Sequence, residues 1–261
     1  MEELAQSLGA PRYRGRQLAQ WIFVKGVTDW DAMTDLPRDF RAALGAQASV
    51  DVPEVERRTP SQDGSQKLVL RYGDGARVQA VLMPDADRLT LCVSTQVGCG
   101  FGCAFCYTGT MGLERNLSAG EIVGQVVAAR EGLAAGLRIT HIVYMGMGEP
   151  LANYTATVKS LRLLTDPQAF AFSPRRITVS TVGLVTGIER LAKLLRGVKG
   201  KVNLIPFNDW EGSSFARPPM ARILDFQTVL LEHGIRATVR WSKGEDIGAA
   251  CGQLREATVP A

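Results

Sequence analysis

The first fifty residues carry the pattern of short amphipathic helices. Apolar residues recur there at helical spacing in two runs, which are Leu18, Trp21 and Ile22, and then Phe40 and Leu44. The Leu36-Pro37 pair separates the two runs, because proline is tolerated at a helix start but not inside a helix. We therefore expect a small helical accessory domain over residues 1–50.

The next segment, 51–88, contains the alternation of apolar and polar side chains that is typical of strands. Two alternating runs, 67–72 and 77–83, flank the turn Gly73-Asp74-Gly75 and predict a β-hairpin. The preceding stretch, 50–65, contains two prolines and a glycine and is interpreted as a linker. The segment therefore reads as a linker followed by a hairpin.

From residue 89 onward, strand patterns alternate with helix patterns. The expected strands are 91–95, 141–145, 176–181, 202–206 and 235–241, and the expected helices start at Ser118 and cover 155–164, 185–195 and 220–232. Ser118 and Glu121 form a capping box at the start of the first helix. This alternation predicts an α/β fold with a parallel sheet over 89–261.

Composition indicates a chain that can bury a large core. Hydrophobic residues make up 46% of the 261 residues, and the net charge is +4. Basic residues crowd the amino terminus and the stretch 175–201, which is compatible with RNA binding and with an ordinary solvated face. The sequence shows no apolar leader and no run of eighteen apolar residues, so we expect a soluble cytoplasmic protein with reduced thiols.

Three of the five cysteines form one compact motif, Cys99-Gly-Phe-Gly-Cys103-Ala-Phe-Cys106. This C-x-x-x-C-x-x-C spacing supplies three thiolates to one metal centre, and the loop offers no fourth. An iron–sulfur cube has four irons, so three cysteines leave one iron open to bind and activate a small molecule. S-adenosylmethionine can chelate that iron through its amino and carboxylate groups. The motif therefore predicts a 4Fe-4S cluster with S-adenosylmethionine.

A structural zinc site and a disulfide are the alternatives for the same loop. Zinc prefers four protein ligands, and the only histidines, His141 and His233, belong to other segments. Disulfides are rare in a reducing compartment, to which the composition assigns this chain. Both alternatives are less well supported by the sequence than the iron–sulfur cluster, and of the two the zinc site is better supported than the disulfide.

Unusual residues follow several of the expected strands. They are the cysteine motif, Gly146-Met-Gly-Glu-Pro150, Ser180 and Asn208. Ligands of parallel sheets gather outside the carboxyl ends of the strands, so we expect these residues to share one site. The glycine turn would let backbone approach a ligand closely, and Glu149 would accept hydrogen bonds from an ammonium group.

Six ordered motifs resemble the radical S-adenosylmethionine RNA methyltransferases. The motifs are 92–99, the cysteine loop 99–106, 146–150, 179–181, 203–208 and 244–254, and the segments 13–22 and 26–30 also resemble that family's amino-terminal helical domain. The likeness is greatest to members that methylate C2 of adenine in ribosomal and transfer RNA. It extends over nearly the whole chain.

The resemblance implies a fold, an activity and partners. The fold is a partial (β/α)6 barrel with a small amino-terminal helical domain and a hairpin. The activity is methylation of adenine C2 in 23S rRNA, tRNA or both, through a methylated cysteine. The resemblance also implies a flavodoxin-type electron donor and a monomeric state.

It further implies roles for individual residues. Cys99, Cys103 and Cys106 would hold the cluster, and Gly148, Glu149, Ser180 and Asn208 would contact S-adenosylmethionine. Cys251 matches the cysteine that this family methylates, and Cys92 matches the thiol that removes the ring proton and forms a transient disulfide with Cys251. Thiols suit both tasks. Read without the family, Cys92 and Cys251 would be small buried hydrophobes, and Ser180 and Asn208 would cap strand ends.

Two features depart from the family pattern. Relatives usually carry a glutamate thirteen residues before the equivalent of Cys92, where this chain has Gln79, which cannot act as a base. Relatives also have roughly two further strand–helix units, about 60 to 80 residues, between the positions of Ala192 and Lys193. The barrel is therefore expected to be shortened, and the strands ending at Ser180 and Asn208 must pair directly or remain open edges.

Alternative functions stay open at this point. Methylation at adenine C8 uses nearly the same residues. A radical enzyme with another substrate would not need Cys92 and Cys251 as a pair. A noncatalytic RNA-binding remnant would keep the cluster but lose turnover through the shortened barrel.

Overall fold

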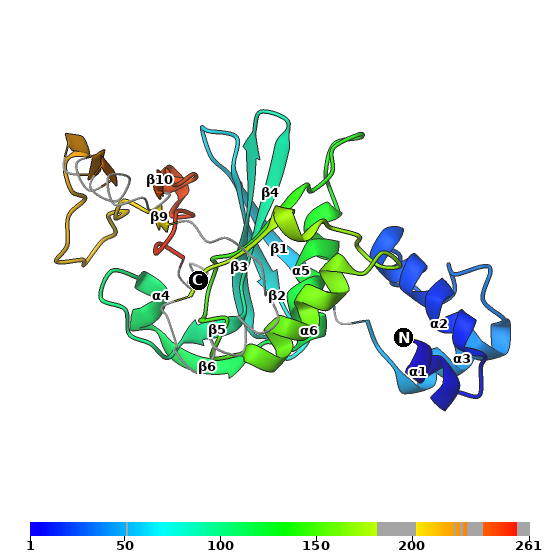
Figure 1. Cartoon of the computed structure of the whole chain (residues 1–261). Helices are drawn as coiled ribbons and strands as arrows, with labels where there is room; N and C mark the ends of the chain where they lie inside the picture. The colour runs from blue at the N-terminus through cyan, green and yellow to red at the C-terminus, as the bar shows by residue number, and fades with distance from the viewer. Residues whose placement is uncertain (51, 182–201, 222, 225–226, 229–236, 255–261) are drawn as a thin grey trace.

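The computed structural model describes residues 1–50, 52–181, 202–221, 223–224, 227–228 and 237–254 (Figure 1). The amino-terminal part is helical, as expected, with α1 (Glu2–Ser7), α2 (Arg12–Ala19), the π-helical turn η1 (Gln20–Val24) and α3 (Arg38–Gln47). These helices lie together at one end of the molecule, on the side away from β9 and β10 (Figure 1).

One six-stranded sheet forms the centre of the molecule. Its strands are β1 (Glu54–Pro60), β2 (Gln66–Arg71), β3 (Arg77–Asp85), β4 (Arg88–Val93), β7 (His141–Tyr144) and β8 (Ile177–Val179), in the order β1-β2-β3-β4-β7-β8. Strands β1 to β4 pair antiparallel with one another. From β4 onward the pairing is parallel, since β4 runs parallel to β7 and β7 runs parallel to β8. The predicted hairpin and the predicted parallel strands are thus confirmed, and they belong to the same sheet.

The linker prediction for 50–65 was wrong in its middle part, because Glu54–Pro60 forms β1. This strand is polar and lies at the edge of the sheet, where charged side chains are tolerated on both faces. Its stability comes from the ladder with β2 and from cross-strand ion pairs such as that between Arg77 and Glu56, with Nε and Oε2 2.8 Å apart. Because β1 is mostly polar along its length, its sequence lacks the alternation of apolar and polar residues that usually indicates a strand.

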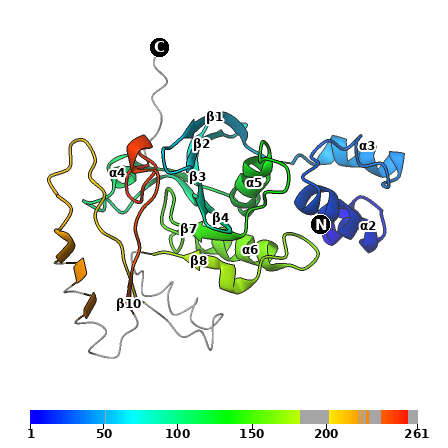
Figure 2. The same ribbon diagram turned by 90° about the horizontal axis from the view of Figure 1, so that it is seen from above.

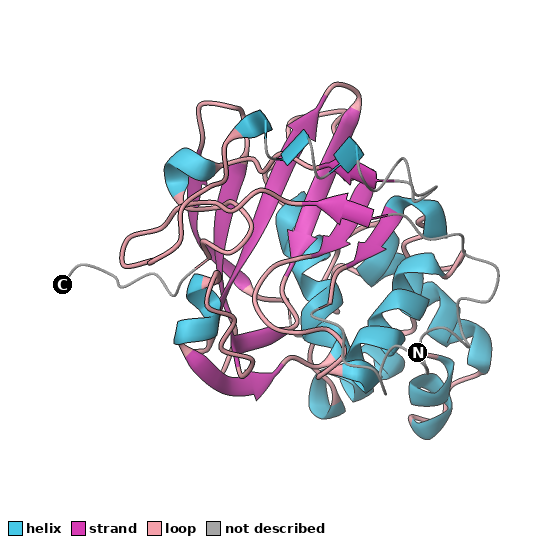
Figure 3. Ribbon diagram, turned by 60° about the vertical axis from the view of Figure 1, so that its left-hand side comes forward, coloured by secondary structure: helices cyan, strands magenta, loops and turns pink. Residues whose placement is uncertain are grey.

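Two helices, α5 (Ala119–Arg130) and α6 (Tyr154–Thr165), cover one face of the sheet (Figure 2). The predicted capping box is confirmed, since the Ser118 hydroxyl accepts a hydrogen bond from the Glu121 N–H and the Glu121 carboxylate accepts one from the Ser118 N–H. The other face of the sheet carries α4 (Tyr107–Thr110) and the carboxyl-terminal segment (Figure 2). Most of the helices thus lie on one side of the strands, and shorter helical segments lie on the other (Figure 3).

Two small sheets complete the described structure. One pairs β5 (Gln96–Cys99) antiparallel with β6 (Gly112–Asn116), and the other pairs β9 (Val202–Leu204) parallel with β10 (Ala237–Val239). Single 3₁₀ turns are η2 (Pro174–Arg176) and η3 (Glu245–Ile247). The strands expected at 202–206 and 235–241 are therefore present, although shorter. The helix expected at 185–195 and much of that at 220–232 lie outside the described residues.

The sequence left two possibilities for the strands that end before Ser180 and Asn208. They could pair with each other, or each could remain an open edge. In the part of the chain that the structure describes, β8 is the last strand of the six-stranded sheet, and β9 pairs with β10 alone. Within those residues the two strands do not pair with each other.

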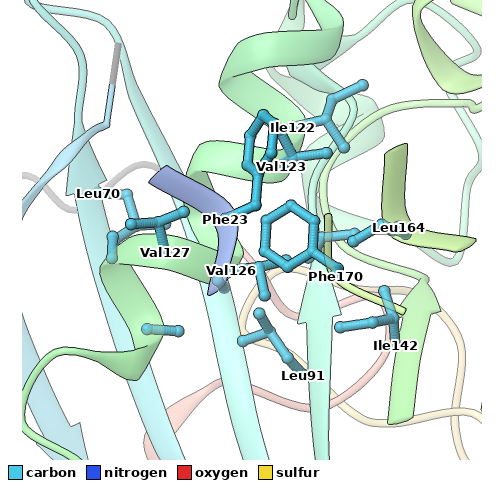
Figure 4. Packing of buried hydrophobic residues seen from close by; sticks show 14 of the residues in the cluster. Phe23, Leu70, Leu91, Ile122, Val123, Val126, Val127, Ile142, Leu164 and Phe170 are labelled. Atoms are coloured by element: carbon cyan, nitrogen blue, oxygen red, sulfur yellow. The ribbon is translucent and has the colours of Figure 1, made fainter. Parts of the chain in front are cut away.

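The core is one continuous cluster that includes the amino-terminal helices. Phe23, in η1, packs against Phe170 with ring centroids 5.1 Å apart, and both rings lie over the apolar side of α5 near Val126 (Figure 4). The Arg130 guanidinium lies over the Phe170 ring and donates a hydrogen bond to the Phe23 carbonyl. The helical segment is therefore packed onto the sheet domain rather than tethered by a linker alone.

A buried glutamine ties α5 to the end of β4. The Gln125 side chain is fully buried, its Oε1 accepts from the Ser94 N–H at 2.9 Å, and its Nε2 donates to the Ser94 carbonyl at 2.8 Å. This pair of bonds replaces the ladder partners that Ser94 loses where β4 ends. None of the described helices combines the length with the apolar character that a bilayer crossing requires.

We expect Gln125→Leu to lower the free energy of unfolding by about 2–4 kcal/mol, because it leaves two buried backbone groups of Ser94 without partners. Urea unfolding of the full chain measures the loss. Gln168→Leu makes the same chemical change at an exposed position and should change stability by less than about 0.5 kcal/mol. Equal midpoints for the two variants would contradict the structural role of Gln125.

Candidate active site

A large cavity of about 1050 Å³ opens at the carboxyl ends of the parallel strands. Its walls come from the cysteine loop, the glycine turn after β7, the end of β8, the segment after β9 and the carboxyl-terminal segment. The predicted site residues that line it are Cys99, Cys103, Cys106, Gly148, Glu149, Ser180, Asn208 and Cys251. The structure therefore brings together every predicted site residue except Cys92, which lies directly behind this wall.

The cysteine loop is held open toward the cavity by local hydrogen bonds. Cys99 ends β5, and Cys106 precedes α4 and donates its N–H to the Cys103 carbonyl at 2.9 Å. Gly109 packs so closely on the loop that an added Cβ would lie 2.9 Å from the Cys103 nitrogen. All three cysteines are free and partly exposed. Burial, followed by the charges of the neighbouring thiols, raises the pKa of Cys99 and of Cys103.

The donor set fits a cluster better than a single ion. Within the described ranges, no three side chains of His, Cys, Asp or Glu converge closely enough to hold one metal ion. Four zinc–sulfur bonds of about 2.3 Å would require sulfurs gathered around one point, whereas each cysteine of an iron–sulfur cube binds a different iron. Three spread thiols beside a large cavity suit a cube with one corner facing the cavity.

The turn after β7 needs glycine at positions 146 and 148, because neighbouring side chains leave no room for a Cβ. An added Cβ at Gly148, whose φ is +95°, would lie 2.5 Å from the Gln96 Cβ, and one at Gly146 would lie 2.6 Å from the Ser94 hydroxyl. The close backbone approach predicted from the sequence is therefore an approach to Gln96 and Ser94. Both side chains also bond the turn, because Ser94 Oγ accepts the Met147 N–H and Gln96 Oε1 accepts the Glu149 N–H, each at 2.8 Å.

The Glu149 carboxylate forms part of the cavity wall. It is 3% exposed, and its Oε1 accepts hydrogen bonds from the Leu151 N–H at 2.8 Å and the Thr181 hydroxyl at 2.7 Å. Thr181 follows Ser180 at the end of β8, so this contact links two strand ends. A buried carboxylate held in this way can accept bonds from an ammonium group in the cavity.

Asn208 bonds mainly to protein. Its side chain is 2% exposed, and Nδ2 donates to the Ser242 hydroxyl and to the Cys251 carbonyl, both at 2.8 Å. The Arg217 guanidinium donates to Asn208 Oδ1 at 2.8 Å and to Glu245 at 2.7 Å. Both amide hydrogens are thus used, and only acceptor capacity remains for a ligand.

The Cys251 segment is fixed from two further sides. The Gly252 carbonyl accepts the Tyr107 N–H at 2.7 Å, and the Leu254 carbonyl accepts the Thr108 hydroxyl at 2.6 Å. Gln253 Nε2 donates to the Asp209 carbonyl at 2.6 Å. The Cys251 backbone is therefore held between the cysteine loop and the segment after β9, and its partly exposed residue lines the large cavity.

Cys92 lies on β4 between Val81 of β3 and Val143 of β7, and it is 6% exposed. A small cavity of about 20 Å³ is lined by both Cys92 and Cys251, which places the two thiols next to each other. Burial raises the pKa of Cys92 to about 12, and the neighbouring Cys251 contributes in the same direction. Both cysteines are free thiols in this structure.

Gln79 occupies the position where the family pattern has a glutamate. It lies on β3 two residues before Val81 and so shares a strand face with the residue that pairs with Cys92. The side chain is 2% exposed, and the Gln79 carbonyl accepts a bond from the Ser94 hydroxyl. The position is thus close to Cys92, although an amide there cannot take a proton.

Sequence reasoning missed four residues that shape this site: Gln96, Thr181, Arg217 and Arg240. Gln96 lies inside a recognised motif, but its task of holding Glu149 depends on a contact over more than fifty positions. Arg217 and Arg240 lie in polar stretches without a motif that indicates a partner. Only tertiary structure reveals their roles.

Family models match two parts of the chain. Residues 1–50 match the ribosomal RNA large subunit methyltransferase N-terminal domain, and residues 93–208 match the radical SAM superfamily. The matched regions correspond to the amino-terminal helices and to the strands that surround the cavity.

Individual relatives extend the likeness over the whole chain. The dual-specificity RNA methyltransferase RlmN of Halorhodospira halophila is 38% identical, with 95% of this chain and 89% of the relative covered. The Solidesulfovibrio magneticus protein of the same name is also 38% identical, with 98% and 93% covered. The crystal structure of a radical SAM methyltransferase from Sphaerobacter thermophilus superposes with a TM-score of 0.87 at 39% identity, and covers 97% of this chain and 96% of that one.

The alignment lengths agree with a shortened barrel. The 319 aligned positions with the Halorhodospira protein include 95% of this 261-residue chain, about 248 residues, so about 71 positions have no residue here. Two strand–helix units are of this size. The expected position of the gap, after Ala192, lies outside the described residues.

We expect Gly148→Ala to destabilise the site, because the new Cβ meets Gln96 and the positive φ is strained for alanine. The loss should be about 1–3 kcal/mol or more, measured as a shift in the urea midpoint. Gly120→Ala is the control, since its Cβ would meet only the Ser118 hydroxyl at 3.7 Å in the first turn of α5. Equal midpoints for the two variants would show that the Gly148 turn tolerates a side chain.

Proposed function

Because this chain belongs to the RlmN family of radical S-adenosylmethionine RNA methyltransferases, we propose that it methylates C2 of adenine in 23S rRNA, tRNA or both. We further propose that Cys251 carries the methyl group in transit. The observation that supports this most directly is the convergence of three loop cysteines and Cys251 on one cavity, with Cys92 beside Cys251.

Cys99, Cys103 and Cys106 would hold the 4Fe-4S cluster, since they belong to one loop that lines the cavity. Glu149 would accept hydrogen bonds from the amino group of S-adenosylmethionine, and the backbone at Gly148 would border the same group. Ser180, at the end of β8, would contact another polar part of the cofactor. When bound, the cluster and S-adenosylmethionine supply a methyl group and the means to abstract a hydrogen atom from it.

A carrier cysteine answers a chemical difficulty. The target carbon of adenine lies between two ring nitrogens and is electron-poor, so it does not attack a methyl sulfonium directly. The Cys251 thiol is a better nucleophile and can take the methyl group by displacement. Its backbone is held by Asn208, Tyr107 and Thr108, so the sulfur stays in the cavity for the second stage.

Cys92 would act after the methylene carbon has bonded to the ring. Its thiolate would take the ring proton as the ring radical gives up one electron to the proposed cluster, and the thiol would then lose that proton to solvent. The Cys92 sulfur would next attack the Cys251 sulfur, so that the bond from Cys251 to the methylene carbon breaks as the disulfide forms, and this carbon takes a proton to become the methyl group of the product. The adjacency of the two thiols supports this pairing. Because position 79 holds an amide, no carboxylate there competes for the ring proton.

Asn208 is better supported as a positioning residue than as a cofactor donor. Its amide hydrogens go to Ser242 and to the Cys251 carbonyl. We therefore propose that Asn208 fixes the Cys251 segment and offers the cofactor at most an acceptor oxygen. This revises the role that the family resemblance implied.

RNA is the proposed partner, and the family model matched at residues 1–50 supports a part for the amino-terminal helices in binding it. A flavodoxin-type electron donor, a monomeric state and a cytoplasmic location complete the proposal. The noncatalytic remnant stays the second candidate, because the aligned relative has about 71 positions with no residue here and β8 and β9 do not pair among the described residues.

Two matched variants test the roles of the thiols. After anaerobic reconstitution with S-adenosylmethionine, mass spectrometry should find one added methyl on Cys251 in the native chain and in Cys92→Ala. Cys251→Ala should carry none. Only the native chain should yield RNA with methylated adenine, because each variant lacks one thiol of the pair.

The same experiment separates the alternatives. An unmodified Cys251 in the fully loaded native chain supports the remnant. Methylated RNA from Cys251→Ala contradicts a carrier cysteine. Digestion of the RNA to nucleosides distinguishes methylation at C2 from methylation at C8.

A further inference from the structure

The positively charged side chain of Arg240 lies beside the thiols of Cys92 and Cys251. Arg240 follows β10, and its backbone N–H donates to the Leu204 carbonyl at 2.8 Å, which fixes the residue at the end of the two-stranded sheet. The side chain is half-buried and lines the same small cavity as Cys92 and Cys251. Its Nη1 lies 2.8 Å from the Met145 sulfur.

No carboxylate forms an ion pair with Arg240 among the residues that the structure describes. The other arginine near this segment, Arg217, pairs with Glu245. The other cation on the small cavity, Lys243, has Asp85 at 3.9 Å and donates to the Pro84 carbonyl. A half-buried guanidinium without an anion is unfavourable unless a nearby group can become one. Among the described residues that line the small cavity, the groups that can become anions are the thiols of Cys92 and Cys251.

The shape of the site argues against a ligand as the missing anion. The small cavity, at about 20 Å³, has room for one water-sized group. Arg240 is not among the described residues that line the 1050 Å³ cavity, where a cofactor would fit. The anion that Arg240 stabilises should therefore belong to the protein.

We propose that the Arg240 guanidinium is a positioning residue that stabilises the ionised form of Cys92, and through it the removal of the ring proton. This inference rests on the proposed function of Cys92. The thiol first loses its proton to solvent, and the thiolate later takes the proton of the ring carbon and becomes a thiol again. Met145 connects the two groups, because its sulfur contacts Arg240 and its backbone bonds to Cys92.

Electrostatics at Cys92 agrees with this arrangement. Burial raises the pKa of the thiol most strongly, the charge of Cys251 raises it further, and Arg240 and the Met145 backbone lower it. Among the described residues, the charged or ionisable groups that line the small cavity with Cys92 are Cys251, Arg240 and Lys243, and the last of these is already paired. Methylation removes the ionisable proton of Cys251, which leaves Arg240 as the main charge acting on Cys92. The first half-reaction would thus prepare the second.

The test measures the rate at which iodoacetamide alkylates Cys92 in the full reconstituted chain. Every chain tested also carries Cys251→Ala, which removes the ionisable group at position 251, as methylation would. Peptide mass spectrometry reports the rate at Cys92 separately from the other cysteines. Arg240→Met should slow alkylation about tenfold at a fixed mildly alkaline pH, because an adjacent opposite charge lowers the pKa of an acid by one unit or more. Arg240→Lys should restore most of the rate. Lys243→Met is the matched control and should change the rate less than about twofold.

The change in the Cys92 alkylation rate distinguishes an effect of the Arg240 charge from an effect of reagent access, because the two change the rate in opposite directions. A smaller side chain opens the cavity, so if access limits the reaction, both Arg240 variants should react faster than the parent. Faster or unchanged alkylation in Arg240→Met would overturn the inference, as would a variant with lysine that reacts as slowly as the one with methionine. Methylation of Cys251 in an otherwise native Arg240→Met chain tests the proposed function separately. If that methyl is present and Cys92 reactivity does not depend on Arg240, this inference alone fails.

Discussion

The hydrogen bonds that hold the Cys251 segment are the constraint on which the site depends. Three of them reach the segment from parts of the chain more than forty positions away, from Tyr107, Thr108 and Asn208. They fix the backbone of a residue that lines both the large cavity and the small one. A carrier group needs this combination, because it must meet two partners without leaving the site.

Burial sets the chemistry of the two thiols apart. Cys251 borders the large cavity and is partly exposed, whereas Cys92 is enclosed by β3, β4 and β7. Burial keeps the Cys92 thiol neutral at ordinary pH, with a pKa of about 12. A neutral thiol is protected from side reactions until its environment changes. Arg240 lines the small cavity with both thiols and has no carboxylate ion-pair partner among the described residues, so it can favour the charged form.

Two sheets that no described strand joins border the cavity. In the described ranges, β8 ends the central sheet, and β9 with β10 forms a separate pair that borders the cavity from the other side. Side-chain contacts rather than a strand ladder bridge the site in this part of the molecule. Thr181 bonds to Glu149, and Asn208, Arg217 and Glu245 link the β9 end to the carboxyl-terminal segment. Relatives about 70 positions longer retain the segment that this chain lacks.

The sequence by itself determined the strands with clear alternation, the Ser118 capping box, and the residues that meet at the cavity, because period, caps and motif spacing are local signals. It misplaced β1, since an edge strand held by ion pairs carries no apolar period. Tertiary structure alone decided that the Gly148 turn packs on Gln96, that Asn208 holds the Cys251 carbonyl, and that Arg240 lies beside Cys92. These contacts join positions far apart in the chain, and the side chains involved are polar residues whose partners no local pattern specifies.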